Sequence, residues 1–128
     1  MLELNRLAKK IHQNNKLKGF YETEKNLGEM LMLIVTEVAE ACEADRKNDA
    51  MDPSIDLPGL VLQAKKSPKM FKENFENKVK DTFEDELADI MMRTLDMAAY
   101  LDIDIAHHIL AKIEYNKTRE HMHDGKKY

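Results

Sequence analysis

The sequence has little of what disulfide-stapled, membrane-spanning or strand-rich proteins need. Its 128 residues include one cysteine, Cys42, no tryptophan, four glycines and three prolines. A lone cysteine excludes an internal disulfide, and it favours a reducing, cytoplasmic location. No apolar run approaches the roughly 20 residues that span a bilayer, and the N-terminus lacks the apolar region of a signal peptide. We therefore expect a soluble chain with no membrane partner.

Residues with high helix propensity dominate what is present. Leu, Met, Ala, Glu and Lys are frequent, charged residues make up 34% of the chain, and aromatic residues only 6%. This composition favours helices over strands. The length suits one domain over residues 1–128 with a single modest core. The net charge of −4 does not fit the basic stripe of nucleic-acid-binding proteins, so we expect no nucleic acid polymer as a partner.

The apolar periodicity predicts two long helices in the first third of the chain. The first is expected over residues 2–17, with Gly19 ending it. The second is expected to be capped by Thr23 and to extend to Arg46. Its apolar stripe keeps close to the 3.6-residue period and consists of Leu27, Leu31, Ile34, Val38 and Cys42.

The remainder predicts a loop, a short helix and two further long helices. Residues 47–66 contain Pro53 and the Pro58-Gly59 pair, and are predicted to form a loop. A short helix is expected after Pro68. Asp81 or Thr82 then opens a helix, and Asp102 or Asp104 caps the last one. The predicted inner face of the helix after Thr82 consists of Phe83, Leu87, Ile90, Thr94, Met97 and Leu101. We thus expect an all-α bundle of about four main helices.

Two acidic pairs are the most informative feature of the chain: Glu37-x-x-Glu40 and Glu86-x-x-Asp89. Residues three apart on a helix differ by about 300° of rotation, so both carboxylates of a pair leave the helix on nearly the same side. Each pair falls on the shoulder of an apolar stripe and not on the solvated back of its helix. Burying an uncompensated carboxylate costs several kcal/mol, which predicts a positive charge nearby.

The cation that best fits four converging carboxylates is Mg²⁺, with Mn²⁺ as the alternative ion, since both take oxygen ligands. The competing interpretation is a solvated acidic surface. Acidic residues every three or four positions are common on exposed helix faces, and Asp89 with Arg93 has the spacing of an ordinary intrahelical ion pair.

The acidic pairs carry a resemblance to a known family. Residues 36–44 read TEVAEACEA and residues 85–92 read DELADIMM, and together they resemble the E-x-x-E … E-x-x-D signature of the MazG-like nucleotide pyrophosphohydrolases. This family belongs to the all-α NTP pyrophosphatase group. His12-Gln13 and Gly19-Phe20-Tyr21 near the start, and YNKTREH over residues 115–121, are also similar to that family.

The resemblance implies an Mg²⁺-dependent hydrolase that cleaves a nucleoside triphosphate between its α and β phosphates, giving the monophosphate and pyrophosphate. It implies a homodimer or homotetramer and a house-cleaning role in removing unwanted dNTPs. Carried over by position, the metal ligands and catalytic residues are Glu37, Glu40, Glu86 and Asp89. Asn116 and Arg119 would approach the phosphates or the base. Phe20 follows a glycine turn, where its ring could stack on a base.

One departure from the family concerns spacing. The 45 residues of segment 41–85 separate Glu40 from Glu86, more than the compact form of the motif has, and this puts the substrate in doubt. Two alternatives remain. A ferritin-like di-iron bundle requires Glu-x-x-His on two helices, and the sequence offers only Glu120-x-x-His123. A non-catalytic helical bundle that binds a nucleotide or another protein would leave the acidic pairs merely solvated.

Overall fold

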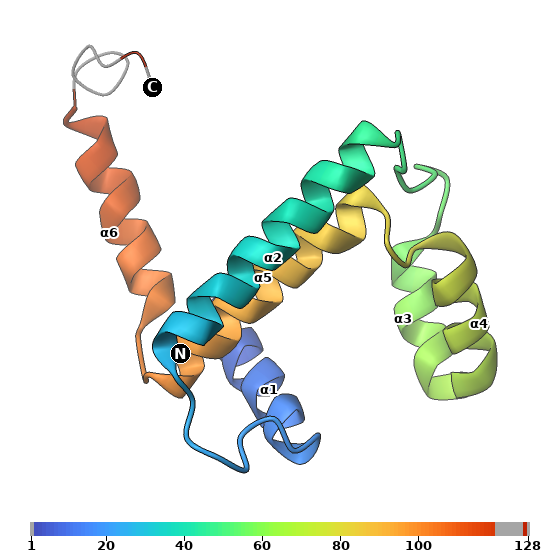
Figure 1. Ribbon diagram of the computed structural model, residues 1–128, viewed down its shortest axis with the longest axis horizontal. Helices are drawn as coiled ribbons and strands as arrows, with labels where there is room; N and C mark the ends of the chain where they lie inside the picture. Colours follow the sequence, from blue (N-terminus) through green and yellow to red (C-terminus); the bar gives the residue numbers. More distant parts are fainter. Residues whose placement is uncertain (1, 120–126, 128) are drawn as a thin grey trace. The chain divides into compact units, whose positions relative to one another are not determined.

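The computed structural model describes residues 2–119 and residue 127. Within these residues, α-helices joined by turns and loops make up the structure (Figure 1). The helices are α1 (Glu3–Leu17), α2 (Leu27–Arg46), α3 (Leu57–Lys66), α4 (Pro68–Lys78), α5 (Phe83–Tyr100) and α6 (Ile105–Lys117). The described part of the chain contains no strand. The all-α prediction is therefore confirmed, although six helices stand where about four main ones were expected.

The prediction that segment 47–66 forms a loop is wrong, because this segment contains α3. Residues 57–66 are helical, and the Asp56 side chain caps them by accepting a hydrogen bond of 3.0 Å from the Gly59 backbone N–H. Pro58 lies in the first turn, where a helix has no use for the missing N–H. The Pro-Gly pair thus belongs to a helix start and not to a break.

Capping residues at the other helix ends act through their backbone or their side chains. Gly19, with φ of +87°, closes α1 as predicted, and the Phe20 N–H donates to the Asn15 carbonyl in the pattern of a Schellman motif. The predicted start of the second helix at Thr23 is wrong, since Asn26 caps α2 through the Glu29 N–H. The predicted cap Asp104 does accept from the His107 N–H at the start of α6.

The chain divides into two compact units, residues 1–24 with 94–128 and residues 25–93, and the division falls inside α5. The first unit contains α1, the second part of α5 and α6. Its core consists of Ala8, Ile11 and Leu95, with Leu4, Ala99 and Ile105 packed against them. Asn5 ties α1 to α6 because its side-chain amide donates to Asp104 and accepts from the Ala106 N–H.

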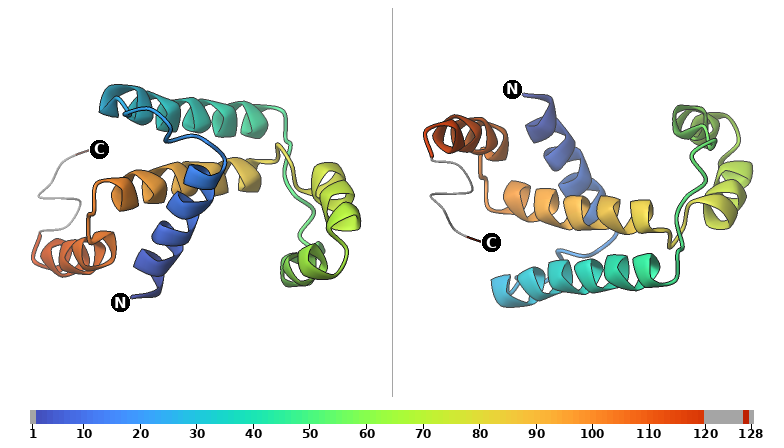
Figure 2. Two further views of the ribbon diagram at one scale, coloured as in Figure 1. Left: turned by 90° about the horizontal axis from the view of Figure 1, so that it is seen from below. Right: turned by 90° about the horizontal axis from the view of Figure 1, so that it is seen from above.

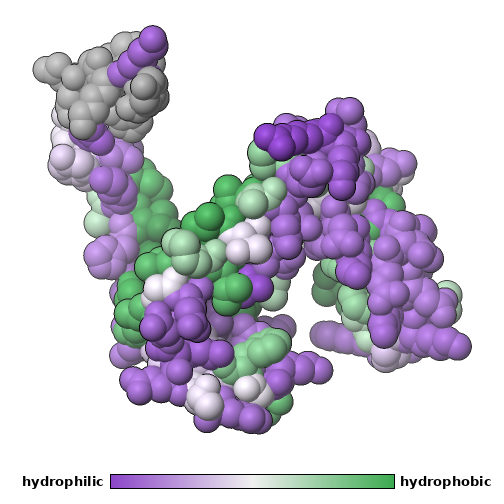
Figure 3. Space-filling model, in the orientation of Figure 1, coloured by the Kyte–Doolittle hydropathy of each residue, from purple (hydrophilic) through white to green (hydrophobic). Residues whose placement is uncertain are grey.

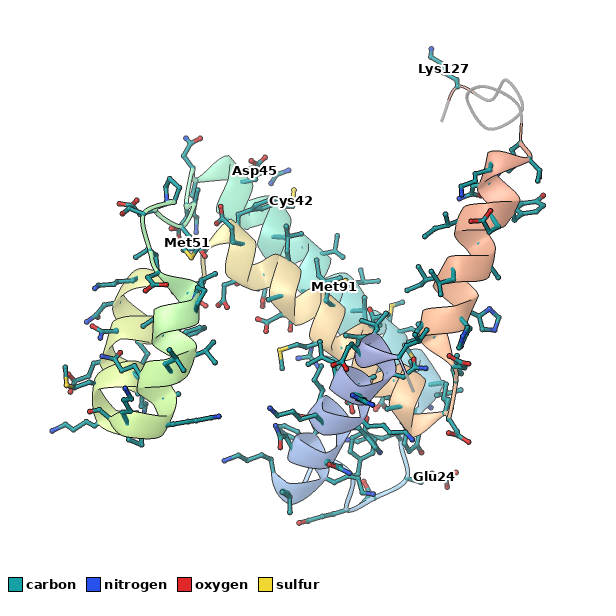
Figure 4. The ribbon with its side chains drawn as sticks, turned by 180° about the vertical axis from the view of Figure 1, so that it is seen from behind. Glu24, Cys42, Asp45, Met51, Met91 and Lys127 are labelled. Atoms are coloured by element: carbon teal, nitrogen blue, oxygen red, sulfur yellow. The ribbon has the colours of Figure 1, made fainter. Side chains whose placement is uncertain are left out.

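The second unit contains α2, α3, α4 and the first part of α5. In both views of Figure 2, α3 and α4 lie side by side, and the Asn74 side chain donates to Gln63 across them. Helix α2 runs antiparallel to α5 (Figure 1). The Phe83 N–H donates to the Asp49 carbonyl, and the Met51 N–H donates to the Glu84 carboxylate. Figure 4 shows Met51 in the loop that follows α2. These contacts fix the start of α5 beside the end of α2.

The predicted inner face of α2 is wrong, and that of the helix after Thr82 is partly confirmed, since Phe83, Ile90, Thr94 and Met97 are half-buried. On α2 the buried residues are Glu37, Ala41 and Ala44, while several residues of the apolar stripe are exposed. Leu87 on α5 and Leu101 just after it, which were also predicted to face inward, are exposed. Helix α2 therefore buries small and acidic residues, and most of its large apolar side chains are exposed.

Two predictions concern membranes and the tail. Among the described residues, no helix combines the length and the apolar character needed to cross a membrane. Glu120, His121, His123 and Gly125, which the sequence analysis assigned to a tail, lie outside the described residues.

Candidate metal centre

Three of the four predicted ligands lie together where α2 passes α5. Glu37 and Glu40 are one turn apart on α2, and Glu86 lies in the first turn of α5. One carboxylate oxygen from each of the three lies within 4.8 Å of those of the other two. The Thr82 hydroxyl accepts a hydrogen bond from the Asp85 N–H and starts α5 one turn before this point. The cluster thus depends on the helix start that the sequence predicted.

Burial distinguishes this cluster from a solvated acidic surface. Glu37 is 7% exposed and Glu86 is 5% exposed, while Glu40 is open to solvent. Both Oε2 atoms, of Glu37 and of Glu86, are covered by protein, and no group among the described residues forms a hydrogen bond with either. A buried polar atom without a partner costs roughly 1–3 kcal/mol, and more when it carries charge. Two such atoms beside a third carboxylate fit a bound cation, which would supply the missing partner to both.

A protein cation partly compensates the cluster. The Nε of Arg93, two turns after Glu86 on α5, donates a hydrogen bond of 2.7 Å to Oε1 of Glu37. From the sequence, Arg93 was expected only as an intrahelical partner of Asp89. The missed signal is the seven-residue spacing from Glu86 to Arg93, which puts both side chains on one face of a helix.

Electrostatics separate the protonation of the two buried carboxyls. Burial is the main cause that raises the pKa of Glu86 to about 7, and the hydrogen bond with Glu40 and the charges of Glu40, Asp89 and Glu37 raise it further. Burial also acts to raise the pKa of Glu37, but the hydrogen bond and charge of Arg93, together with interactions with the Glu40 and Glu86 carboxyls, outweigh it and leave that pKa below its ordinary value. Near neutral pH, Glu37 is therefore an anion, while Glu86 holds its proton more strongly than an ordinary glutamate does.

The fourth predicted ligand, Asp89, lies beside this group but is not one of its three members. It is half-buried, and burial raises its pKa, with the charges of Asp85, Glu37 and Glu40 acting in the same direction. Asp89 also lines a pocket of about 580 Å³ that Phe71 and Phe75 help to form. Asp89 thus borders a largely apolar space.

The other predicted site residues belong to the first unit. Phe20 follows the turn at Gly19, and Asn116 lies on α6; both are exposed, and Arg119 is half-buried after α6. The expected approach of these three residues to a nucleotide stays a prediction.

The first unit also contains a polar cluster that the sequence did not predict. Both oxygens of the nearly buried Asp96 carboxylate accept hydrogen bonds, one from the Tyr21 hydroxyl at 2.6 Å and one from His12 Nδ1 at 2.8 Å. The Tyr100 ring contacts both the Tyr21 and His12 rings. These contacts tie the segment after α1 to α5.

Comparisons with known proteins identify no relative: no protein-family model, curated protein or solved structure matches this chain.

Proposed function

We propose that this chain is an Mg²⁺-dependent nucleoside triphosphate pyrophosphohydrolase, with Mn²⁺ as an alternative ion. In the reaction, water attacks the triphosphate, the bond between the α and β phosphates breaks, and the products are the monophosphate, pyrophosphate and a proton. The resemblance of the acidic signature to the MazG-like family suggests this reaction. The observation that supports it best is the pair of buried carboxylate oxygens without partners, on Glu37 and Glu86.

The three clustered carboxylates suit a metal that handles phosphates. Mg²⁺ prefers a few carboxylates and completes its shell with water and substrate phosphates. Glu37 and Glu86 would hold the ion from the protein side, while the exposed Glu40 can face a ligand that arrives from solvent. When bound, such an ion polarises a phosphoryl oxygen and lowers the pKa of a water molecule.

The chain's own residues would then bind the ion and move one proton. Glu86, with a pKa of about 7, loses its proton readily when a cation approaches, because the cation favours the carboxylate form. Glu40 is the exposed carboxylate of the group, and it is the best-placed residue to accept a proton from an attacking water. Proton transfer of this kind contributes roughly a hundredfold or more to a rate.

The test is pyrophosphate release from a panel of NTPs and dNTPs with Mg²⁺, Mn²⁺ or EDTA. We expect one or a few nucleotides to give monophosphate and pyrophosphate only with a metal. The Glu37→Gln and Glu86→Gln variants should lose at least a hundredfold in rate. The matched control is Glu43→Gln. Glu43 is on α2, as Glu37 is, and its carboxylate pairs with Arg46 and Lys47. Metal binding without turnover on any nucleotide would instead favour a non-catalytic nucleotide-binding bundle.

We also propose that a second copy of the chain covers the apolar face of α2. Five of the eight buried hydrophobic residues described are alanines, and no large side chain among them is fully buried. In contrast, large apolar residues are exposed along α2, and Figure 3 shows apolar groups spread over this helix. They are Leu27, Leu31, Met32, Leu33, Val35 and Val38. A patch of this kind marks an interface, and soluble proteins most often bury such a patch in a symmetric dimer.

A further inference from the structure

Arg93 does more at this centre than neutralise one glutamate. We infer that Arg93 is a phosphate-binding residue, whose Nε is held by Glu37 while its two Nη atoms donate to a metal-bound di- or triphosphate. The inference rests on the proposed metal centre and extends it, because it assigns the recognition of the phosphate chain to a residue outside the acidic signature.

The first argument is geometric. Among the described residues, the hydrogen bond of the guanidinium is that from Nε to Glu37 Oε1, at 2.7 Å. The Arg93 side chain is 43% exposed, while that of Glu37 is 9% exposed. One edge of the guanidinium is therefore anchored to a buried ligand, and the remaining donors can reach solvent. A guanidinium that is held at one edge and open at the other is already oriented for a bidentate contact with phosphate.

The second argument is electrostatic. Each positive charge beside the acidic cluster makes the approach of a polyphosphate more favourable. A single Mg²⁺ brings two charges to a group that contains Glu37, Glu40 and Glu86, with Asp89 beside it. Arg93 adds a third charge, and its 2.7 Å contact with Oε1 of Glu37 places it beside these carboxylates. The cation adjoining the metal ligands is thus the residue best placed to meet the substrate's phosphates.

A merely structural role makes the opposite prediction for metal binding. If Arg93 only supports Glu37, its loss should disorder that ligand and weaken binding of both metal and phosphate. If it binds phosphate, its loss should weaken phosphate binding alone. Removing a positive charge from beside the carboxylates should leave metal binding unchanged or make it tighter, since the cation then meets less repulsion.

The experiment compares the wild type with Arg93→Gln and Arg93→Lys by calorimetry. The first titration uses Mn²⁺ alone. The second adds methylenediphosphonate, a diphosphate that cannot be hydrolysed, to the Mn²⁺-loaded protein, and inorganic phosphate serves as the short ligand. The control is Arg46→Gln, which removes the same charge from α2, where Arg46 pairs only loosely with Glu43 at 3.9 Å. Circular dichroism and thermal unfolding check that each variant is folded.

We expect Arg93→Gln to bind methylenediphosphonate about ten- to a hundredfold more weakly, the size of a lost charge-assisted hydrogen bond. Its affinity for Mn²⁺ alone should match or exceed that of the wild type, and Arg93→Lys should fall between the two for the diphosphonate. Parallel loss of Mn²⁺ and diphosphonate binding, or unchanged diphosphonate binding, overturns the inference and leaves the metal centre standing. A wild type that binds no Mn²⁺ overturns both proposals.

Discussion

Glu37 on α2 and Glu86 on α5 each bury one carboxylate oxygen that no donor satisfies, and the two side chains belong to one cluster. Their environments differ, because Arg93 bonds to Glu37 and leaves Glu86 among like charges. Two like carboxyls in one buried place therefore have pKa values displaced in opposite directions. The raised pKa of Glu86 bears on how metal and pH affect stability.

Divalent metal should stabilise the protein. A ligand that binds only the folded state at a hundred times its Kd adds about 2.7 kcal/mol. We expect Mn²⁺ or Mg²⁺ to raise the thermal midpoint by several degrees and EDTA to reverse the shift. In the Glu86→Gln variant the shift should vanish, while Glu43→Gln should retain it. Differential scanning fluorimetry gives the result, and an equal response from both variants would argue against this site.

Without metal, stability should fall as pH rises from about 5 to about 7. Glu86 has an ordinary pKa of 4.5 when unfolded and one of about 7 when folded. Over this interval the folded state binds the extra proton, so the free energy of unfolding drops by up to about 1.4 kcal/mol per pH unit. The raised pKa of Asp89 acts in the same direction. The Glu86→Gln variant should show a flatter profile and exceed the wild type in stability at pH 8. Urea unfolding at several pH values with EDTA measures this, and a wild-type profile that rises over the interval would contradict it.

The hydroxyl of Tyr21 should contribute to the stability of the first unit. It donates to Asp96 at 2.6 Å, and burial, followed by that hydrogen bond, raises the pKa of Tyr21 above its ordinary value. Hydrogen bonds to charged groups contribute about 1.5–3 kcal/mol, so Tyr21→Phe should lower the free energy of unfolding by about that amount. The control is Tyr115→Phe, since the Tyr115 side chain is exposed on α6. Urea unfolding of both variants decides the matter, and equal effects would show that the contact with Asp96 is worth little.

Gly19 should resist replacement by alanine. Its φ of +87° lies in the left-handed region, where a Cβ costs roughly 1–2 kcal/mol. We expect Gly19→Ala to destabilise the protein by about 1 kcal/mol, and Gly19→Asn to cost less because asparagine tolerates this conformation. Thermal unfolding of the two variants tests the order, which a purely steric effect of side-chain size would reverse.

A charge on the apolar face of α2 should dissociate the proposed oligomer. Leu31 is 49% exposed, so Leu31→Lys costs little core packing but would bury a charge in an interface between copies. We expect light scattering coupled to gel filtration to show a smaller species, with helicity unchanged. Leu17→Lys is the control, because Leu17 is 86% exposed at the end of α1. A wild type that is already monomeric would refute the proposal.

The sequence predicted the helices better than their packing. Periodicity located α1, α5 and α6 because an apolar stripe at 3.6-residue spacing indicates a helix whatever lies against it. The same stripe cannot reveal whether its partner is in the same chain. For α2 the stripe containing Leu31 and Val38 is exposed, and alanines with Glu37 form the buried contact. Helix α3 was missed because Pro58 and Gly59 were interpreted as breakers, whereas the Asp56 cap makes them a helix start.

For the site, spacing alone found the acidic residues. Glu37, Glu40 and Glu86 could be predicted because a pair three residues apart must share a side of its helix. That Asp89 lies outside the closest group depends on how α2 approaches α5, which no local pattern encodes. The contact between Arg93 and Glu37 could not be predicted either, because the two residues are on different helices.

The pKa of about 7 at Glu86 makes metal uptake an exchange of one cation for another. An ion that enters must displace whatever fraction of a proton Glu86 carries, so the apparent Kd of the metal should tighten from pH 6 to pH 8 and then level off. The released protons pass to the buffer. The same calorimetric titration in PIPES and in Tris should therefore give different heats, and the difference divided by the gap in buffer ionisation enthalpy counts the protons that leave.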